Sequence, residues 1–223
     1  RNRTALGALF ANRPDVAIDL LPVPFIGAVA QAAVEAGVPL VNTFYVTPEL
    51  QALDAAARER GITLLPELGM DPGLDLLLLG DAARRFDRIL EILCYGAGVP
   101  EPAAANNPLK YKISWTFEGV LRSYLRPACL VRDGGEIHLP AADQFAPEHG
   151  HTVTVNDVDA LEAFPNGNVL PYLRLLGVDP SGVRRAGRFA MRYPGHSAFW
   201  KTMVDLHLLD DEAVVVDGVA VNR

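Results

Sequence analysis

Two side chains that can move protons stand where the chain leaves apolar, strand-like runs. Asp71 lies in the segment "LPELGMDPGLD", and Tyr45 lies in the segment "NTFYVTP". A carboxylate can accept a proton or bind an ammonium group, and a phenol can donate to a carboxylate or join a proton transfer. We therefore take Asp71 and Tyr45 as candidate catalytic residues. The alternatives are structural: Asp71 as a helix N-cap before Pro72 at the first helical position, and Tyr45 as a ring packed under a loop.

Amide and cationic side chains gather in a second segment, "NNPLKYKISW". Asn106, Asn107 and Lys112 offer hydrogen-bond donors and a positive charge, which suit the carboxylate of an amino acid. If residues 111–115 form a strand, Lys110 and Lys112 share one of its faces. The alternative is a strand whose lysines are only solvated.

A third segment, "RYPGH", adds an arginine and a histidine. Arg192 can clamp a carboxylate through two parallel hydrogen bonds, or it can form a surface ion pair. His196 can act as a base near neutral pH, or it can begin a helix and make a structural hydrogen bond. Together with Asn106, Asn107 and Lys112, these two residues form the candidate substrate-binding set.

The elements that must position Asp71 and Tyr45 alternate between strand and helix. Short apolar runs predict strands, and helix-forming runs that end in glycine predict helices. The strands are expected at residues 15–22, 38–43 and 62–66, and the helices at residues 25–37 and 47–61. Thr47 as N-cap and Pro48 as the first helical residue mark the start of the second helix. This alternation with short links predicts right-handed crossovers and a parallel sheet.

The pattern changes in the rest of the chain, where strands, hairpins with Asp-Gly turns and helices follow one another. Strands are expected at 88–96 and 111–115, hairpins at 129–139 and 213–221, and helices at 74–86, 117–125, 170–176 and 197–208. Residues 140–156 are polar and are expected to form a surface excursion. The prediction is α/β, a partial Rossmann domain over residues 1–86, followed over residues 87–223 by an α+β domain with a mixed, largely antiparallel sheet.

Composition and charge exclude several classes of protein. Half of the 223 residues are hydrophobic and the net charge is −7, so no basic surface suited to nucleic acid is predicted. No apolar run reaches the roughly 18 residues needed to span a bilayer and no signal peptide is visible, so we expect a cytoplasmic protein that binds no membrane. Cys94 and Cys129 match no zinc spacing, and we expect reduced core cysteines and no bound metal.

The phosphate loop of a dinucleotide-binding domain does not occur in the sequence. Such a loop has the pattern G-x-G-x-x-G between a first strand and a helix. The single G-x-G is Gly96-Ala97-Gly98, in the wrong domain and without a third glycine at the required spacing. Because the chain also opens on "RNRTALGALF" without methionine, we expect that residues precede Arg1 and that this is the back portion of a dinucleotide enzyme. The alternative is a protein that binds no dinucleotide.

Five segments resemble, in the same order, those of the saccharopine dehydrogenase family, which includes saccharopine reductases and lysine 6-dehydrogenases. They are "NTFYVTPELQALD", "LPELGMDPGLD", "GVPEPAAANNPLKYKISWTFEGVL", "EAFPNGNVLPYLRLLG" and "RYPGHSAFWKTMVDLHLLDDEAVVVDGVAV". The resemblance covers nearly the whole chain but only the back part of a family member. It implies a Rossmann domain followed by a substrate and dimerisation domain. It also implies a homodimeric enzyme that uses NAD or NADP to oxidise or reduce a C–N bond of an amino acid.

The resemblance also implies where the cofactor lies. Ligands of open α/β sheets bind beyond the carboxyl ends of the strands, and the nicotinamide is expected there, facing the second domain. The expected cofactor-binding residues are Leu21, Pro22, Thr43, Gly69 and Gly73. The two glycines serve tight turns or a close backbone approach, by a ligand or by the chain itself.

The sequence departs from the resemblance at two positions. Saccharopine reductases carry a cysteine in "CGGLP", where this chain has Gly96, and they tend to follow "FPN" with an arginine, where this chain has Gly167. Saccharopine has three carboxylates, so the loss of that arginine makes a smaller diamino acid such as lysine an alternative substrate. Two other hypotheses remain: a non-catalytic dimerising scaffold of the same family, and an unrelated α/β binding protein.

The missing phosphate loop predicts that this chain by itself binds dinucleotide poorly. The loop's backbone N–H groups would otherwise hold the pyrophosphate at a helix N-terminus. In a calorimetric titration of the chain with NAD⁺ or NADP⁺, we expect no binding at micromolar concentrations. A micromolar dissociation constant would contradict this prediction.

Overall fold

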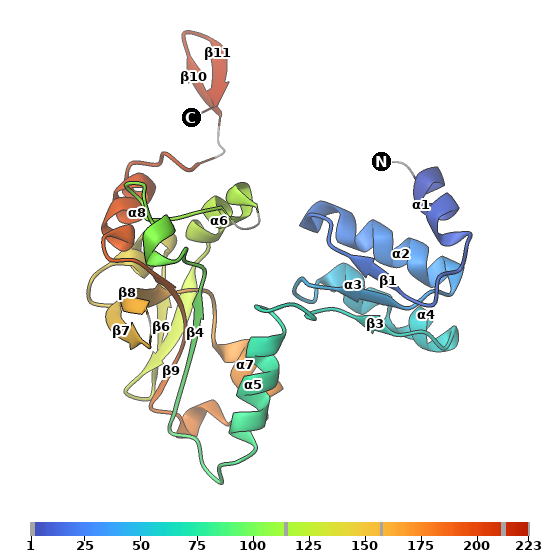
Figure 1. The fold of residues 1–223 in the computed structure, drawn as a ribbon, viewed down its shortest axis with the longest axis horizontal. Helices are drawn as coiled ribbons and strands as arrows, with labels where there is room; N and C mark the ends of the chain where they lie inside the picture. Colours follow the sequence, from blue (N-terminus) through green and yellow to red (C-terminus); the bar gives the residue numbers. More distant parts are fainter. Residues whose placement is uncertain (1–2, 114–115, 157, 211–212, 223) are drawn as a thin grey trace. The chain divides into compact units, whose positions relative to one another are not determined.

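The computed structural model describes residues 3–113, 116–156, 158–210 and 213–222. The chain divides into two compact units, Arg1–Ala82 and Ala83–Arg223 (Figure 1). The boundary expected from the sequence lies near Asp87, slightly further along the chain. Each unit has its own sheet and its own hydrophobic core.

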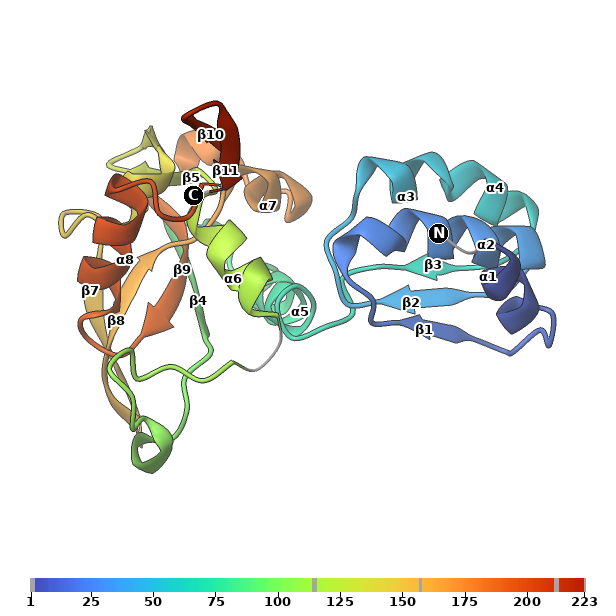
Figure 2. The same ribbon diagram turned by 90° about the horizontal axis from the view of Figure 1, so that it is seen from above.

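The first unit contains a three-stranded parallel sheet, which confirms the sheet predicted from the strand–helix alternation. Its elements are α1 (Arg3–Phe10), β1 (Ala17–Asp19), η1 (Val23–Phe25), α2 (Ile26–Ala36), β2 (Leu40–Asn42), α3 (Pro48–Ala52), α4 (Asp54–Glu59), β3 (Leu64–Leu65) and α5 (Leu74–Ala83). The strand order is β1-β2-β3, with Asp19 opposite Asn42 and Leu40 opposite Leu64. Helices α2, α3 and α4 lie on one side of the sheet (Figure 2).

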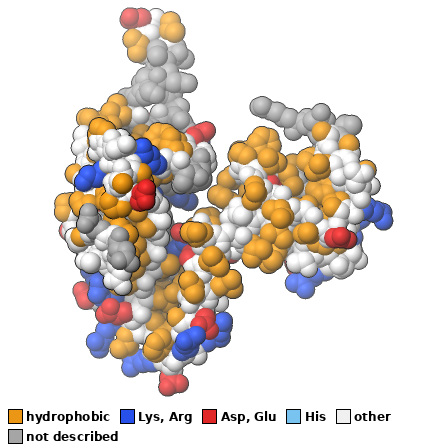
Figure 3. Space-filling model, in the orientation of Figure 1, with side chains coloured by type: hydrophobic (Ala, Val, Ile, Leu, Met, Phe, Trp, Pro, Cys, Tyr) orange, Lys and Arg blue, Asp and Glu red, His pale blue; other side chains and the backbone are white. Residues whose placement is uncertain are grey.

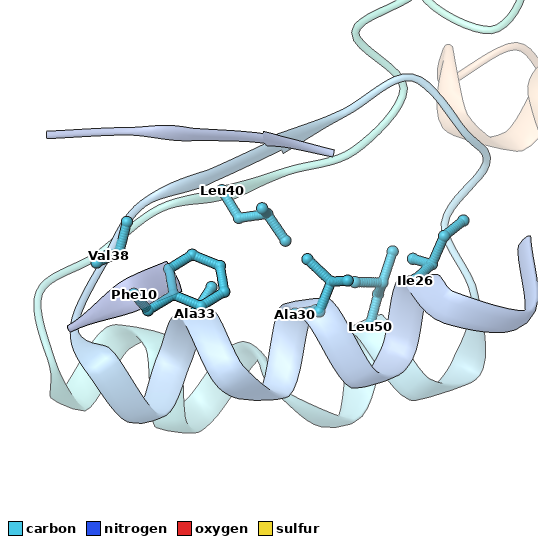
Figure 4. Close-up of a cluster of buried hydrophobic side chains, with 8 residues drawn as sticks. Phe10, Ile26, Ala30, Ala33, Val38, Leu40 and Leu50 are labelled. Atoms are coloured by element: carbon cyan, nitrogen blue, oxygen red, sulfur yellow. The ribbon is translucent and has the colours of Figure 1, made fainter. Parts of the chain in front are cut away.

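The core of the first unit fills the space between the sheet and α2 (Figure 4). Phe10 of α1, Ala30 and Ala33 of α2 and Leu40 of β2 are at most 2 % exposed. Apolar residues three and four positions apart give α2 this buried face. The helix ends at Gly37, whose φ of 70° is the left-handed conformation that glycine adopts without strain.

The single helix predicted over residues 47–61 is wrong, because the structure has two helices there. The start is as predicted: Thr47 Oγ1 accepts the N–H of Leu50 at 3.3 Å, and Pro48 is the first helical residue. The N–H of Leu53 then bonds to the carbonyl of Leu50, three residues back rather than four. This tight turn separates α3 from α4.

The opposite face of the first sheet is not covered by a helix among the described residues. Ile18, Val41 and Leu65 are neighbours across the three strands and point to that face. Ile18 is 68 % exposed and Leu65 is 43 % exposed, and Figure 3 shows many apolar side chains on the surface of this unit. Parallel sheets are usually covered on both faces. No helix among the described residues is long and apolar enough to cross a bilayer.

The second unit contains a six-stranded mixed sheet, which confirms the predicted fold class. Its elements are β4 (Glu91–Ala97), η2 (Pro102–Ala104), α6 (Phe117–Tyr124), β5 (Ala128–Arg132), β6 (Gly135–Leu139), η3 (Ala141–Phe145), β7 (His151–Val155), β8 (Val158–Pro165), α7 (Leu170–Leu175), η4 (Pro180–Gly182), β9 (Arg185–Arg192), α8 (His196–Asp205), β10 (Ala213–Val216) and β11 (Val219–Asn222). The order is β6-β5-β9-β8-β7, and β4 pairs with β9 in the sheet's parallel contact. Strands β10 and β11 form a separate hairpin.

Both predicted hairpins form at their Asp-Gly turns. Asp133 and Gly134 join β5 to β6, and Asp217 and Gly218 join β10 to β11. All four residues have a positive φ, between 52° and 80°, as a two-residue type I′ turn requires. This turn type matches the twist of the flanking strands, so it sets the register of each hairpin.

Strand β9 is the centre of the second sheet, and the sequence analysis did not predict it. All of β4 pairs with one edge of β9, from Arg185 to Met191. The other edge is shared, because β5 pairs with the start of β9 and β8 with its end. Between these two strands, the N–H of Asn166 bonds to the carbonyl of Arg188 at 2.8 Å. Phe189 and Met191 enter one core of the unit, and Ala190 enters the core on the other face.

The strand predicted at residues 111–115 is wrong where the structure describes it. Residues 111–113 form no strand, and residues 114–115 lie outside the described residues. Asn107 bonds to the backbone of Tyr111, and Lys110 has a left-handed φ of 48°. Lys110 and Lys112 therefore do not share the face of a strand.

The surface excursion predicted at residues 140–156 is also wrong. Helix η3 lies in this segment and buries Gln144 and Phe145, which are 1 % and 2 % exposed. The Gln144 amide donates to the carbonyl of Tyr124 at 2.8 Å, so its polar group is satisfied inside the unit. Strand β7 follows and pairs with β8 at the edge of the sheet.

Two leucines of α7 provide a test of the second core. Leu173 is fully buried, whereas Leu175 on the same helix is 69 % exposed. We expect Leu173→Ala to lower the free energy of unfolding by about 2–5 kcal/mol, because it leaves a cavity, and Leu175→Ala to change it by less than about 0.5 kcal/mol. Both tryptophans, Trp115 and Trp200, belong to this unit, so urea unfolding followed by their fluorescence measures the difference. Equal effects of the two substitutions would contradict the packing described.

Candidate functional site

The loops that follow the three parallel strands lie at one edge of the first sheet. β1 ends at Asp19, β2 at Asn42 and β3 at Leu65, and the carboxyl ends of neighbouring parallel strands meet at the same edge. A backbone hydrogen bond of 3.0 Å from the N–H of Leu68 to the carbonyl of Asn42 ties the loop after β3 to the end of β2. Residues from both loops are thereby brought together.

The two candidate catalytic residues are hydrogen-bonded to each other at this edge. Tyr45 follows β2 and Asp71 follows β3, and the Tyr45 hydroxyl donates to Asp71 Oδ1 at 3.0 Å. Asp71 is exposed, and Tyr45 is partly buried with its ring edge against Phe44. The Asp71 carboxylate is therefore held by a phenol while it remains accessible from solvent.

Asp71 does not cap a helix, so that interpretation is wrong. Helix α5 begins at Leu74, so Pro72 lies outside the helix. The carboxylate at the helix start is that of Asp75, whose Oδ1 accepts the N–H of Gly73 at 2.7 Å.

Gly69 and Gly73 allow the loop after β3 to fold onto itself. Gly73 has a φ of 148°, and a Cβ there would lie 2.1 Å from the carbonyl oxygen of Gly69. A Cβ on Gly69 would lie 3.2 Å from the Thr43 Cβ, so these two expected cofactor residues are in contact range. The close approach at Gly73 is made by the chain itself rather than by a ligand.

Two polar residues at the same edge were missed by the sequence analysis. Asp19 and Asn42 are the last residues of β1 and β2 and are 5 % and 2 % exposed. Asp19 Oδ1 accepts the N–H of Leu21, and Asn42 Oδ1 accepts the N–H of Phe44, both at 2.9 Å. Burial raises the pKa of Asp19, and the Leu21 hydrogen bond opposes that rise. The signal available in the sequence was the polar residue at the end of each of these two short strands.

Each of these residues has one buried polar atom that is not used. Asp19 Oδ2 and Asn42 Nδ2 have no hydrogen-bond partner among the described residues. Such atoms are rare in folded proteins, because their desolvation is not compensated. The other expected cofactor residues of this edge, Leu21, Pro22 and Thr43, are exposed.

In the second unit, the loop at residues 106–112 is organised by its own amides. Asn107 Oδ1 accepts the N–H groups of Leu109 and Tyr111, and its Nδ2 donates to the carbonyl of Tyr111 at 2.8 Å. Lys112 Nζ donates to Asn106 Oδ1 at 2.8 Å on the surface. Asn107 therefore shapes the loop, while the side chains of Asn106 and Lys112 are exposed.

This loop packs on the end of β9, where the predicted arginine lies. The Arg192 guanidinium carbon is 5.4 Å from the centre of the Tyr111 ring, and Lys110 Nζ is 5.9 Å from that of Tyr193. Both contacts place a cation over an aromatic ring. Arg192 Nη1 donates to the carbonyl of Met191, and its buried Nε has no partner among the residues that the structure describes.

His196 is buried next to this loop and begins α8. It is 3 % exposed, its Nε2 is 2.8 Å from the Tyr124 hydroxyl, and its ring stacks on Phe164. Burial and, to a lesser extent, the charge of Arg192 lower its pKa to about 3. The ring is therefore neutral at pH 7, which matches the structural alternative rather than a base that titrates near neutrality.

Glu162, which the sequence analysis also missed, fixes the start of α8. Its Oε2 accepts the N–H of Gly195 at 2.9 Å, and its Oε1 accepts the N–H of Ser197. A carboxylate at a helix N-terminus satisfies N–H groups that lack a partner inside the helix. Glu162 lies opposite Arg192 in the register of β8 and β9. Its bonds to Gly195 and Ser197 therefore hold His196 beside the end of the central strand.

The structure thus gathers the candidate residues into one set in each unit. A Rossmann-type parallel sheet with a polar carboxyl edge is followed by a mixed sheet with an amide- and cation-rich loop. Residues 1–65 match the saccharopine dehydrogenase NADP binding domain, and residues 69–219 match the saccharopine dehydrogenase C-terminal domain. The chain belongs to the saccharopine dehydrogenase family, as its five segments predicted.

Relatives of this chain occur in a plant, in mammals and in fungi. It is 34 % identical to alpha-aminoadipic semialdehyde synthase of Arabidopsis thaliana, over 92 % of the chain and 20 % of that protein. It is 31 % identical to the NADP(+), L-glutamate-forming saccharopine dehydrogenase of Pyricularia oryzae, over 89 % of the chain and 44 % of that protein. The apo saccharopine dehydrogenase (L-Glu forming) of Saccharomyces cerevisiae superposes with a TM-score of 0.82 at 28 % identity, over 96 % of this chain and 48 % of that one. The chain spans less than half the length of each of these proteins.

Gly167 has a backbone conformation that suits glycine. It stands where saccharopine reductases tend to carry an arginine, and its φ is 83°. An L-amino acid at such a φ is strained. The chain therefore has glycine instead of arginine at a position whose backbone conformation favours glycine.

The buried state of His196 predicts a pH dependence of stability. The folded chain keeps this ring neutral down to about pH 3, whereas an unfolded histidine takes up a proton near pH 6.5. Below pH 6.5 the unfolded state binds more protons than the folded state. His196 therefore lowers the free energy of unfolding as the pH falls from 6.5 toward 3, and it has no such effect above pH 6.5. Tyr124, Tyr111 and Arg192 face the ring, and none offers a negative charge that would hold the proton at neutral pH.

We expect His196→Gln to reduce the fall in the free energy of unfolding between pH 7 and pH 5. Urea unfolding followed by tryptophan fluorescence at both pH values measures this fall. His207→Gln, at an exposed histidine bonded to Asp210, is the control and should leave most of the fall in place. An unchanged fall in His196→Gln would contradict the prediction.

Proposed function

We propose that the full-length protein is an NADP-dependent oxidoreductase that acts on the C–N bond of an amino acid of the saccharopine or lysine type. The Tyr45–Asp71 hydrogen bond at the carboxyl edge of a parallel sheet carries this proposal. The match to an NADP binding domain and the NADP(+) in the names of the fungal relatives support NADP as the cofactor.

The polar edge of the first sheet fits the nicotinamide end of such a cofactor. The unused buried atoms Asp19 Oδ2 and Asn42 Nδ2 lie at the ends of β1 and β2, and a polar ligand there would meet donors and acceptors that are already desolvated. A nicotinamide bound there would supply a hydride acceptor for the carbon beside the amine nitrogen. The residues that would hold it are Leu21, Pro22, Thr43, Gly69 and Gly73.

In this proposal Asp71 accepts the proton of the substrate amine. The carbon loses a hydride and the nitrogen loses a proton, so a C=N double bond forms between them. Water then adds to this imine, and cleavage of the C–N bond releases a carbonyl compound and an amine. Tyr45 holds Asp71 Oδ1 through its hydroxyl, which keeps the carboxylate in one orientation. The exposure of Asp71 lets it return its proton to solvent.

The second unit contributes groups for the charged ends of the amino acid. Lys112 and Asn106 are proposed to bind a carboxylate, and the Arg192 guanidinium offers a planar set of donors with an unused Nε. Asn107 and His196 act as positioning residues. Asn107 shapes the loop at residues 106–112, and His196 fixes Tyr124 beneath it.

The substrate itself is the finer part of the proposal. Saccharopine is favoured by the names of the fungal relatives, whereas Gly167 in place of arginine favours a substrate with fewer carboxylates, such as lysine. A non-catalytic scaffold of the same family is the second candidate, and Gly96 and Gly167 motivate it. A homodimer is proposed in both cases, on the resemblance to family members with a dimerisation domain.

Activity of the full-length protein tests the proposal. We expect NADP⁺ to be reduced in the presence of saccharopine or lysine, measured by the absorbance of NADPH. Asp71→Asn should lower kcat by about 100-fold or more, because it removes a proton acceptor. Tyr45→Phe should lower kcat by about tenfold through loss of a hydrogen bond to a charged group.

Asp54→Asn provides the control, because Asp54 is another exposed carboxylate of the first unit and pairs with Arg58 at 2.8 Å. Its kcat should equal that of the unmodified protein. Full activity in Asp71→Asn would remove the assigned role of this carboxylate. A stable dimer that oxidises neither amino acid with NADP⁺ or NAD⁺ would favour the scaffold.

A further inference from the structure

The hairpin β5–β6 brings a cysteine, a histidine and a glutamate onto one face. The Asp133-Gly134 turn sets the register, in which Cys129 lies opposite His138 and Val131 lies opposite Glu136. Residues two apart on a strand share a face, and so do directly opposite residues of paired strands. Cys129, Glu136 and His138 therefore point to the same side of the hairpin.

Cys129 and His138 are a pair whose side chains approach closely. The N–H of Cys129 bonds to the carbonyl of Gly167, and its carbonyl accepts the N–H of Val169, both at 3.1 Å. The backbone groups of Cys129 thus point away from β6, which defines a non-hydrogen-bonded pair with His138. Side chains of such pairs are nearer to each other than those of hydrogen-bonded pairs.

The three ligand-type atoms converge. Cys129 Sγ, a Glu136 carboxylate oxygen and a His138 ring nitrogen all lie within 4.8 Å of one another. His138 Nε2 is 3.2 Å from Glu136 Oε2. Two ligand atoms bound to one tetrahedral Zn²⁺ at about 2.0 Å each are about 3.3 Å apart, so this pair already has the spacing of two ligands of one ion.

We propose that Cys129, Glu136 and His138 form a binding site for a divalent transition metal of the Zn²⁺ type, with a fourth coordination position open to water or another ligand. Thiolate, imidazole and carboxylate are the protein ligands of Zn²⁺. On binding, the metal replaces the thiol proton, which passes to solvent.

The burial of the three side chains fits this arrangement. Cys129 is 2 % exposed and forms the floor of the site, and the hydrogen bond from its Sγ to the carbonyl of Leu130, at 3.8 Å, is a weak one. The side chains of His138 and Glu136 are 69 % and 51 % exposed, so they can rotate to close the remaining gap to Sγ. No metal was expected from the sequence, because the spacing of the two cysteines along the chain matches no zinc motif. The three ligands proposed here come together across a hairpin turn instead.

A surface ion pair is the competing account of His138 and Glu136. Exposed pairs of this kind contribute little to stability. The chain offers a matched example without a thiol, in which His207 Nδ1 lies 2.8 Å from Asp210 Oδ2. This second pair separates the two accounts, because it has the histidine and the carboxylate but not the third ligand.

The experiment titrates the metal-free chain with ZnCl₂ in the presence of a chromophoric chelator, and in parallel with CoCl₂. We expect one Zn²⁺ per chain and a thiolate-to-Co²⁺ charge-transfer band. Cys129→Ser should abolish the band. His138→Gln and Glu136→Gln should each raise the dissociation constant for Zn²⁺ by at least about tenfold, since loss of even outer-shell partners has effects of that size. The control His207→Gln should leave the dissociation constant unchanged.

Three results would overturn the proposal. One is the absence of stoichiometric Zn²⁺ binding by the folded chain. Another is Co²⁺ binding without the charge-transfer band. The third is an unchanged dissociation constant in His138→Gln and Glu136→Gln, which would mean an adventitious ion only. Should Cys129→Ser fail to fold, these two variants, at exposed side chains, decide the question alone.

Discussion

The second unit depends on the pairing of strand β9 along both of its edges. One edge is bonded to β4 from Arg185 to Met191, and the other is bonded first to β5 and then to β8. A central strand of this kind joins strands that are far apart in the sequence, and its buried backbone groups must all find partners. Arg192 ends β9 and His196 begins the next helix, so the position of β9 decides where the cation and the histidine lie.

Charged side chains stabilise this arrangement rather than oppose it. The Arg188 guanidinium carbon lies 4.4 Å from the centre of the Tyr172 ring although the residue is only 8 % exposed. Arg192 lies over Tyr111, and Glu162 binds the N–H groups at the start of α8. In the first unit, Asp19 and Asn42 play a comparable part, because each bonds to the backbone of the loop that follows its strand.

These contacts explain which parts of the fold the sequence could predict. Thr47 and Gly37 mark helix ends by local hydrogen bonding and φ, and the Asp-Gly pairs mark hairpins by their turn type, so these elements were predicted. Strand β9 reads "RAGRFAMR", and its arginines hid a buried strand because the burial of Arg188 depends on the ring of Tyr172 in another element. The helix break at Leu53 and the loop shaped by Asn107 likewise depend on individual hydrogen bonds rather than on composition.

The candidate site was predictable to the same extent. Tyr45 and Asp71 were found because both follow apolar strands, yet their mutual hydrogen bond depends on how the loop after β3 folds at Gly69 and Gly73. Glu162 gave no signal, since its partners are backbone groups more than thirty residues away. A strand carboxylate that binds the first N–H groups of a helix is identified only when that helix is in place.

The central claim is that the Tyr45–Asp71 pair meets the reacting end of the substrate and cofactor. A crystal structure of the full-length protein with NADP⁺ and saccharopine or lysine tests this claim most directly. The account predicts the Tyr45 hydroxyl or an Asp71 carboxylate oxygen within about 3.2 Å of a polar atom of the bound ligands. Ligands bound with neither residue in contact, and with the Tyr45–Asp71 hydrogen bond unchanged, would contradict it.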